Sequence, residues 1–224
     1  MKKLYTLLAL TISFSMNAQM VDNSPNNNSA GIYSVAMGDG TSASGDASTA
    51  MGINTTASGM GSIAMGRSTT ASGDYSTAMG YQTTASGDYS TAMGRSTDAS
   101  GMYSTALGYY TEASRDYSTA MGRETTASGS LSTALGYQTT ASGYTSTAMG
   151  YGTDASRDYS TAMGRETTAS GSISTVLGYK TTASDYGSLV IGQYNLLGST
   201  VTNSSYGFST ENTAFVIGNG ADAD

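Results

Sequence analysis

A glycine returns every 14 residues through most of this chain. The series begins at Gly38 and ends at Gly192 without a slip in the spacing. A fixed period of this kind indicates a repeat architecture, in which each unit packs on its neighbours. One unit is too short for two capped helices, but it suffices for two short strands and two tight bends, with glycine where the chain reverses. The period therefore predicts an all-β fold, a parallel β-roll or β-solenoid with one coil per repeat.

The residues around each glycine are nearly constant and they alternate in size. Ser and Ala stand four and two places before the glycine, as in Ser34 and Ala36, and Thr stands three places after it, as in Thr41. A period of two places Ser and Ala on one side of a strand and the larger residues on the other. We expect the small set to face inward, because so short a coil leaves room for little else between its two strands. At about 4.8 Å per coil, the stack would be a rod about 55 Å long.

The residue before each glycine is Met, Leu or Ile, which gives the expected rod a continuous apolar stripe. The stripe comprises Met37, Met51, Met65, Met79, Met93, Leu107, Met121, Leu135, Met149, Met163, Leu177 and Ile191. Monomers rarely expose a contiguous apolar patch of more than a few hundred Å². We therefore expect this stripe to be an oligomer interface along the rod. The alternative is a monomeric solenoid in which these side chains point inward and fill the coil.

The composition excludes most functions other than binding. The chain has no Cys, His or Trp, so thiolate and imidazole metal sites and His-dependent catalysis are excluded. Its net charge of −7 argues against a nucleic-acid partner, which requires a basic face. Asp98 and Glu112 occupy equivalent places in neighbouring repeats, and without a pocket-forming sequence we interpret them as surface residues rather than as an acid and a base. We expect no enzyme, no catalytic or metal site, no cofactor and no small-molecule substrate.

A second column of residues could carry a ligand. From Gly66 to Gly178 the residue after the glycine is Arg or Tyr, in alternation for most of the series. This pattern would place guanidinium groups against rings along one edge of the rod. This possible docking ladder comprises Arg67, Tyr81, Arg95, Tyr109, Arg123, Tyr137, Tyr151, Arg165 and Tyr179. The alternative is a solvated ladder that only stabilises the rod. Further Tyr residues, such as Tyr75 and Tyr89, precede the Ser of the repeat and often follow an Asp.

The N-terminus reads as an export signal. Lys2 and Lys3 precede an apolar run over residues 4–16, and cleavage after Ala18 would fit. Removal of residues 1–18 leaves seven basic residues against 16 acidic ones, a net charge of −9. We expect an acidic protein that is exported and either held at the cell surface or outer membrane or released as an extracellular protein.

The repeat resembles a known family. Residues 34–38, Ser-Val-Ala-Met-Gly, with Thr41, Ala43 and Gly45 behind them, are similar to the head repeat of the trimeric autotransporter adhesins, the YadA-like head. The resemblance implies a left-handed parallel β-roll, three chains side by side as a homotrimer, and binding to host matrix proteins, glycans or other cells.

These observations divide the chain into four parts. We expect a signal peptide over 1–18, a flexible lead-in over 19–30 and a YadA-like head of twelve repeats over 31–192. The last part, 193–224, is expected to be an altered terminal repeat or cap, truncated if the chain is a piece of a longer protein.

Two functions remain. The first is a non-enzymatic adhesion module that displays side-chain ladders to a surface partner, with a spacer of a fibre protein in the same class. The second is an ice-binding solenoid, because Thr residues follow the Ser of most repeats in a near-regular column. That column comprises Thr49, Thr77, Thr91, Thr105, Thr119, Thr133, Thr147, Thr161 and Thr175.

Overall fold

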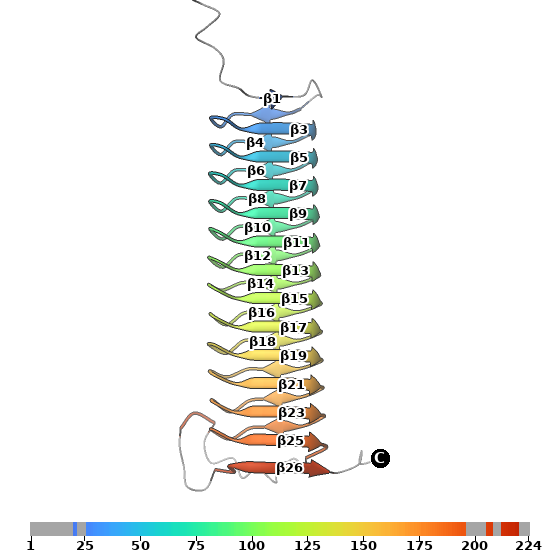
Figure 1. Ribbon diagram of the computed structural model, residues 1–224, viewed down its shortest axis with the longest axis vertical. Coiled ribbons are helices and arrows are strands. Elements are labelled where there is room, and N and C mark those ends of the chain that lie inside the picture. Colours follow the sequence, from blue (N-terminus) through green and yellow to red (C-terminus); the bar gives the residue numbers. More distant parts are fainter. Residues whose placement is uncertain (1–19, 22–25, 196–204, 208–211, 220–224) are drawn as a thin grey trace, which may run out of the picture.

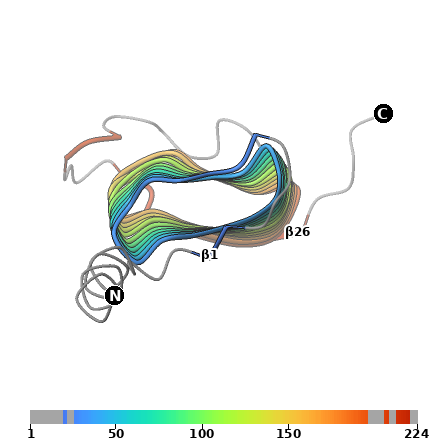
Figure 2. The ribbon, with the colours of Figure 1, turned by 90° about the horizontal axis from the view of Figure 1, so that it is seen from above.

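The computed structural model describes residues 20–21, 26–195, 205–207 and 212–219, which form a straight rod of stacked coils (Figure 1). The expected signal peptide lies outside the described residues. Each 14-residue coil, called a rung below, supplies a five-residue strand to one sheet and a two-residue strand to the other. Seen along the rod, the rungs superpose as a flattened ring whose two long sides are the sheets (Figure 2). The predicted parallel β-solenoid is confirmed.

Within the described residues, sheet A has 14 strands and begins with the two-residue strand β1 (Met20–Val21). Its other strands are β3 (Val35–Asp39), β5 (Thr49–Ile53), β7 (Ile63–Arg67), β9 (Thr77–Tyr81), β11 (Thr91–Arg95), β13 (Thr105–Tyr109), β15 (Thr119–Arg123), β17 (Thr133–Tyr137), β19 (Thr147–Tyr151), β21 (Thr161–Arg165), β23 (Thr175–Tyr179), β25 (Leu189–Gln193) and β26 (Phe215–Asn219).

Sheet B, on the opposite side of the ring, has 12 short strands in the part of the chain that the structure describes. They are β2 (Asn28–Ser29), β4 (Ser42–Ala43), β6 (Thr56–Ala57), β8 (Thr70–Ala71), β10 (Thr84–Ala85), β12 (Asp98–Ala99), β14 (Glu112–Ala113), β16 (Thr126–Ala127), β18 (Thr140–Ala141), β20 (Asp154–Ala155), β22 (Thr168–Ala169) and β24 (Thr182–Ala183).

Strands pair between rungs, all in parallel, and from β3 to β25 each residue lies beside the residue one repeat later. Ala92 pairs with Ala106 in sheet A, and Thr84 pairs with Asp98 in sheet B. Because this register is constant, equivalent residues of successive rungs form straight columns along the rod. Any side chain that recurs in the sequence therefore recurs at one place on the surface.

The core between the sheets consists of the small residues. Ala78 and Ala85 are fully buried, as are Ser76 and Thr83 of the same coils. Among the described residues, the larger hydrophobic side chains that are fully buried are Val176 and Val190. The prediction that Ser and Ala face inward is confirmed, and the inward Thr column completes the core.

The bends impose unusual backbone angles. Gly94, in the repeating glycine column, has φ +126°, and a Cβ there would lie 2.0 Å from the carbonyl oxygen of Gly108. Two further residues of most rungs are left-handed although they carry side chains, for example Gln82 (φ 53°) and Tyr75 (φ 56°). The column of Gly94 therefore requires glycine, because a side chain there has no space. The two left-handed columns, those of Gln82 and Tyr75, tolerate side chains because these point outward.

The rod extends beyond the expected repeat boundaries at both ends. Strands β1 and β2 lie within the segment 19–30, which the sequence indicated to be a flexible lead-in, and both pair with the next rung. At the other end β26 pairs in register with β25 although 26 residues separate Leu189 from Phe215. The lead-in is therefore partly a rung, because backbone pairing needs no repeat motif.

Asparagine side chains complete the Thr column at both ends. Asn27 stands where a further repeat would have the Thr, and its Oδ1 accepts hydrogen bonds from the N–H and the hydroxyl of Thr41 at 3.2 and 2.8 Å. Asn195 stands at the same place beyond the last Thr. Its Oδ1 accepts from the N–H of Thr182 at 2.7 Å and its Nδ2 donates to the Thr182 carbonyl at 2.9 Å. The amide thus pairs with the edge backbone of β24 as another strand would.

Candidate binding surfaces

The apolar stripe lies on the outer face of sheet A. Its strand positions pair in register, as Met51 does with Met65 and Met79 with Met93. Its side chains are half-buried against their neighbours, and Met121 is 40% exposed. The alternative in which these side chains fill the coil is wrong, because the space between the sheets is filled by Ala, Ser, Thr and two Val residues while the stripe side chains remain partly exposed. Whether the stripe is an oligomer interface stays a prediction.

The Thr column proposed for ice binding shares this face with the apolar stripe. Thr91 and Met93 alternate with the buried Ala92 in strand β11, so both project from the same side of sheet A. The large Met, Leu and Ile side chains of the stripe stand beside these hydroxyls. The face is therefore not the flat hydroxyl array that would order water into ice.

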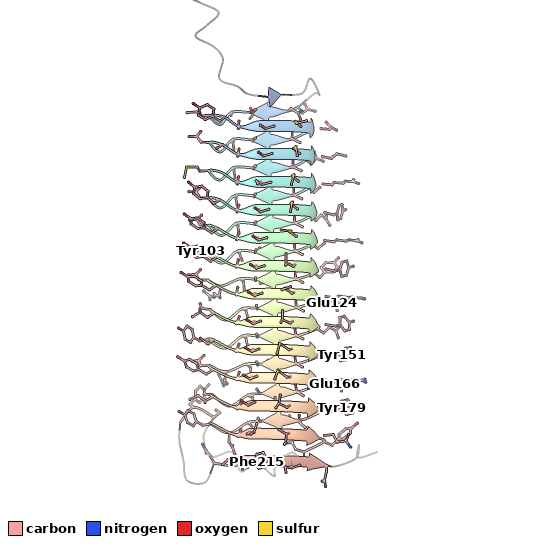
Figure 3. The ribbon with its side chains drawn as sticks, viewed as in Figure 1. Tyr103, Glu124, Tyr151, Glu166, Tyr179 and Phe215 are labelled. Carbon is pink, nitrogen blue, oxygen red and sulfur yellow. The ribbon has the colours of Figure 1, made fainter. Side chains whose placement is uncertain are left out.

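The Arg–Tyr ladder lies along the edge where the sheet A strands end, on which Tyr151 and Tyr179 are seen in Figure 3. The Arg95 guanidinium carbon lies 5.6 Å from the centroid of the Tyr81 ring and 5.4 Å from that of Tyr109. Arg165 lies likewise between Tyr151 and Tyr179, at 5.3 and 5.2 Å. Each of these guanidinium groups therefore has a ring on either side, at cation–π distance. The use of the Arg–Tyr ladder as a docking surface stays a prediction.

Two glutamates reinforce this edge. Arg123 Nε donates to Glu124 at 3.0 Å, and Gln138 of the next rung donates to the other Glu124 oxygen at 2.8 Å. The hydrogen bond from Gln138, followed by that from Arg123, lowers the pKa of Glu124. Arg165 and Glu166 repeat the ion pair at 3.1 Å. The edge thus carries fixed charges of both signs.

A different aromatic column follows the opposite edge, where Tyr103 is seen in Figure 3. The rings of Tyr75, Tyr89, Tyr103 and Tyr117 stack with centroid distances of 5.3, 4.9 and 5.1 Å and nearly parallel planes. These rings are between 44% and 54% exposed. All four residues have left-handed backbones, which turn the side chains outward into one stack.

Sequence reasoning missed the role of the aspartates before these tyrosines. Asp74 Oδ1 accepts the backbone N–H of Met60 at 2.9 Å, and Asp116 Oδ1 accepts that of Met102 at 3.0 Å. Each carboxylate therefore bonds to the rung before it. The sequence did contain a signal for these bonds, because each Asp stands 14 residues, one repeat, after the residue whose N–H it accepts.

On the outer face of sheet B, Asp98 and Glu112 are neighbours in register. Both side chains are exposed. Partial desolvation of its carboxylate by neighbouring atoms, followed by repulsion from Glu112, raises the pKa of Asp98 even though the side chain is exposed on its outer side. In the part of the chain that the structure describes, no group of three or more acidic side chains is close enough to hold a metal ion. Among those same residues, no helix is long and apolar enough to cross a membrane.

The geometry defines a parallel β-solenoid whose side chains repeat in columns, and comparison with known families agrees. The family described as the YadA head domain repeat matches residues 29–54, 43–69, 71–97, 99–125, 127–153, 141–167 and 169–195. These segments cover more than half of the chain, which belongs to the YadA head repeat family. A search for similar curated proteins found no match. The family indicates a surface module of the trimeric autotransporter adhesin type.

Proposed function

We propose that this chain is the exported head of a bacterial surface adhesin, that three copies associate through the apolar stripe, and that the assembled rod binds matrix proteins, glycans or other cells. The observation that carries the proposal is the stripe itself. Its twelve Met, Leu and Ile side chains run in register down the outer face of sheet A and remain partly exposed in the single chain. Membership of the YadA head family supports the same arrangement.

The energetics favour association. The inner columns of Ala, Ser and Thr bury little apolar surface per residue, so one coil gains little to offset the entropy of ordering its backbone. Burying the stripe between copies would add the missing apolar contacts at every rung. The spacing between rungs is the same in every copy. When copies align side by side, each stripe residue therefore lies level with the same stripe residue of the neighbouring copy along the whole rod.

Light scattering of residues 19–224 tests the interface. We expect a trimer for the wild type and monomers for the variant Met79→Asp/Met93→Asp, because charges would be buried without partners. Thr84→Asp is the matched control on sheet B, since Asp98 occupies the same column and is tolerated there. The interface is refuted by a monomeric wild type, or by a Met79→Asp/Met93→Asp variant that remains trimeric.

The Arg–Tyr ladder is the proposed docking surface of the assembled head. Replacing Arg95, Tyr109 and Arg123 by Ala should reduce binding to cells or matrix proteins without changing the mass of the assembly. The control variant removes Tyr89 and Tyr103 from the opposite edge. Adhesion that survives the ladder substitutions would show that the ladder only stabilises the rod.

A further inference from the structure

The tyrosine column is interrupted near its N-terminal end. Tyr33 and Tyr75 belong to it, but the two rungs between them carry Ala47 and Gly61. All four residues share the left-handed backbone, with φ between 55° and 63°. Tyr33 and Tyr75 are three rungs apart, about 14 Å, so the column lacks two rings. Tyr33 is 69% exposed, more than any of the stacked tyrosines.

A cavity occupies the place of the missing rings. Its volume is about 360 Å³, and both Tyr33 and Tyr75 line it together with Ile32, Met60 and Asp46. Asp46 Oδ1 accepts the backbone N–H of Ile32 at 2.9 Å. The cavity is called the tyrosine gap below. It combines two aromatic rings, an apolar lining and one carboxylate.

The charge around the gap selects a cation. Asp46 and Asp74 both lie on this edge, each bonded to the rung before it. The first basic residue of the described chain is Arg67, which belongs to the ladder on the opposite edge. A neutral ring would gain nothing from these carboxylates, whereas a cation gains from both the rings and the charge.

The same molecule shows which cation has the right shape. Between Tyr81 and Tyr109, which are two rungs apart, one planar guanidinium group lies against both rings. The tyrosine gap offers the same type of ring at both ends, and it lacks an arginine of its own. The Tyr75 ring lies beside Gly61, so the free space of the gap is next to Ala47. A planar guanidinium from outside would meet there the contacts that Arg95 makes in the ladder.

We propose that the tyrosine gap is a binding site for an arginine side chain of a basic partner peptide, whose guanidinium stacks on Tyr33 or Tyr75 and pairs with Asp46. The site lies on the edge opposite the Arg–Tyr ladder and apart from the apolar stripe. The proposal names a partner chemistry for the proposed surface head. Its test uses purified protein and a free peptide, so failure here leaves the light-scattering and adhesion results unaffected.

The probe is a capped five-residue peptide of alternating serine and arginine, compared with a twin that has citrulline in place of arginine. Citrulline has the same shape without the charge. Titration is followed by carbon-13 methyl spectra of methionine, in which Met60 lines the gap. We expect a saturable shift of the Met60 signal in the range of about 1–10 mM, and at least fivefold weaker binding of the citrulline peptide.

Three variants locate the site. Asp46→Asn keeps an oxygen that can accept the hydrogen bond from the Ile32 N–H, so it removes only the charge. It should weaken arginine binding about fivefold and reduce the salt dependence of binding. Tyr33→Ala removes one ring and should weaken binding further. Ala47→Tyr fills the gap at a backbone angle already adopted by Tyr75. Gly61 is left unchanged in this variant, because a Cβ there would lie 2.9 Å from the Tyr75 ring. The variant should abolish the shift while the melting curve and assembly mass stay the same.

Each result decides the question. Equal binding of the citrulline peptide would overturn the choice of a cation and point to a neutral planar group. Arginine binding that persists in the filled variant would place the site elsewhere. Absence of any Met60 shift in the wild type would refute the gap as a binding site.

Discussion

Replacing Gly94 by Ala should destabilise the rod far more than its single added methyl group suggests. The residue has φ +126°, and its new Cβ would lie 2.0 Å from the Gly108 carbonyl oxygen. The usual limit for a carbon–oxygen contact is about 3.3 Å, so strands β11 and β13 would have to move apart by about 1 Å. The strained backbone costs about 1–3 kcal/mol, and each weakened hydrogen bond costs about 1 kcal/mol. We expect a loss of about 3–5 kcal/mol in the free energy of unfolding.

The matched control is Gly152→Ser. Gly152 also has a positive φ, +60°, but its Cβ would meet nothing closer than 3.6 Å, the Cγ of Glu166. Ser96 already occupies the equivalent place with φ 53°, so this change should cost about 1 kcal/mol. Urea unfolding followed by circular dichroism, at equal protein concentration, measures both variants. Similar losses for the two variants, within about 1 kcal/mol, would refute the steric argument.

Three smaller effects should follow from the columns. Asp98→Thr should raise the free energy of unfolding by about 0.5 kcal/mol at pH 7, since it removes a charge beside Glu112. Because the pKa of Asp98 is raised in the folded protein, the wild type loses stability as the pH rises above about 4 and this carboxyl group ionises. The advantage of Asp98→Thr over the wild type should therefore vanish below about pH 3 in melting experiments. Asn195→Ala should speed hydrogen exchange of the Thr182 amide, whose bonded acceptor is lost. Arg95→Met should cost about 1 kcal/mol in urea unfolding, and the loss should shrink at high salt.

The repeat was sufficient to predict the architecture because the same constraint acts at every rung. Ala78 and Ala85 could be placed inside from their invariance and small size, and Met79 outside from strand alternation. The stack of Arg95 on its neighbours followed from the constant spacing. These features depend on periodicity and volume, which a sequence displays directly.

Other features depend on backbone angles and on single side chains, which the pattern hides. Tyr75 and Ile173 adopt left-handed angles that such residues rarely take, and the hints in the sequence were Gly61 and Gly187 in the same column. Asn27 and Asn195 end the Thr column by replacing Thr with a residue whose amide imitates a strand. The tyrosine gap was overlooked because it is defined by what Ala47 and Gly61 lack.

The constant register has a consequence for how such a rod can change length. Residues 113–130 and 155–172 are identical in sequence and lie three repeats apart. Gain or loss of whole repeats keeps every column aligned and changes the length by about 4.8 Å each. Insertion of a single residue within a strand would instead turn Ala out of the core, because side chains alternate between the two faces of the sheet. Since all copies in a homo-oligomer come from one gene, a duplication lengthens them together, so the reach of the head can vary while the chemistry of its faces is kept.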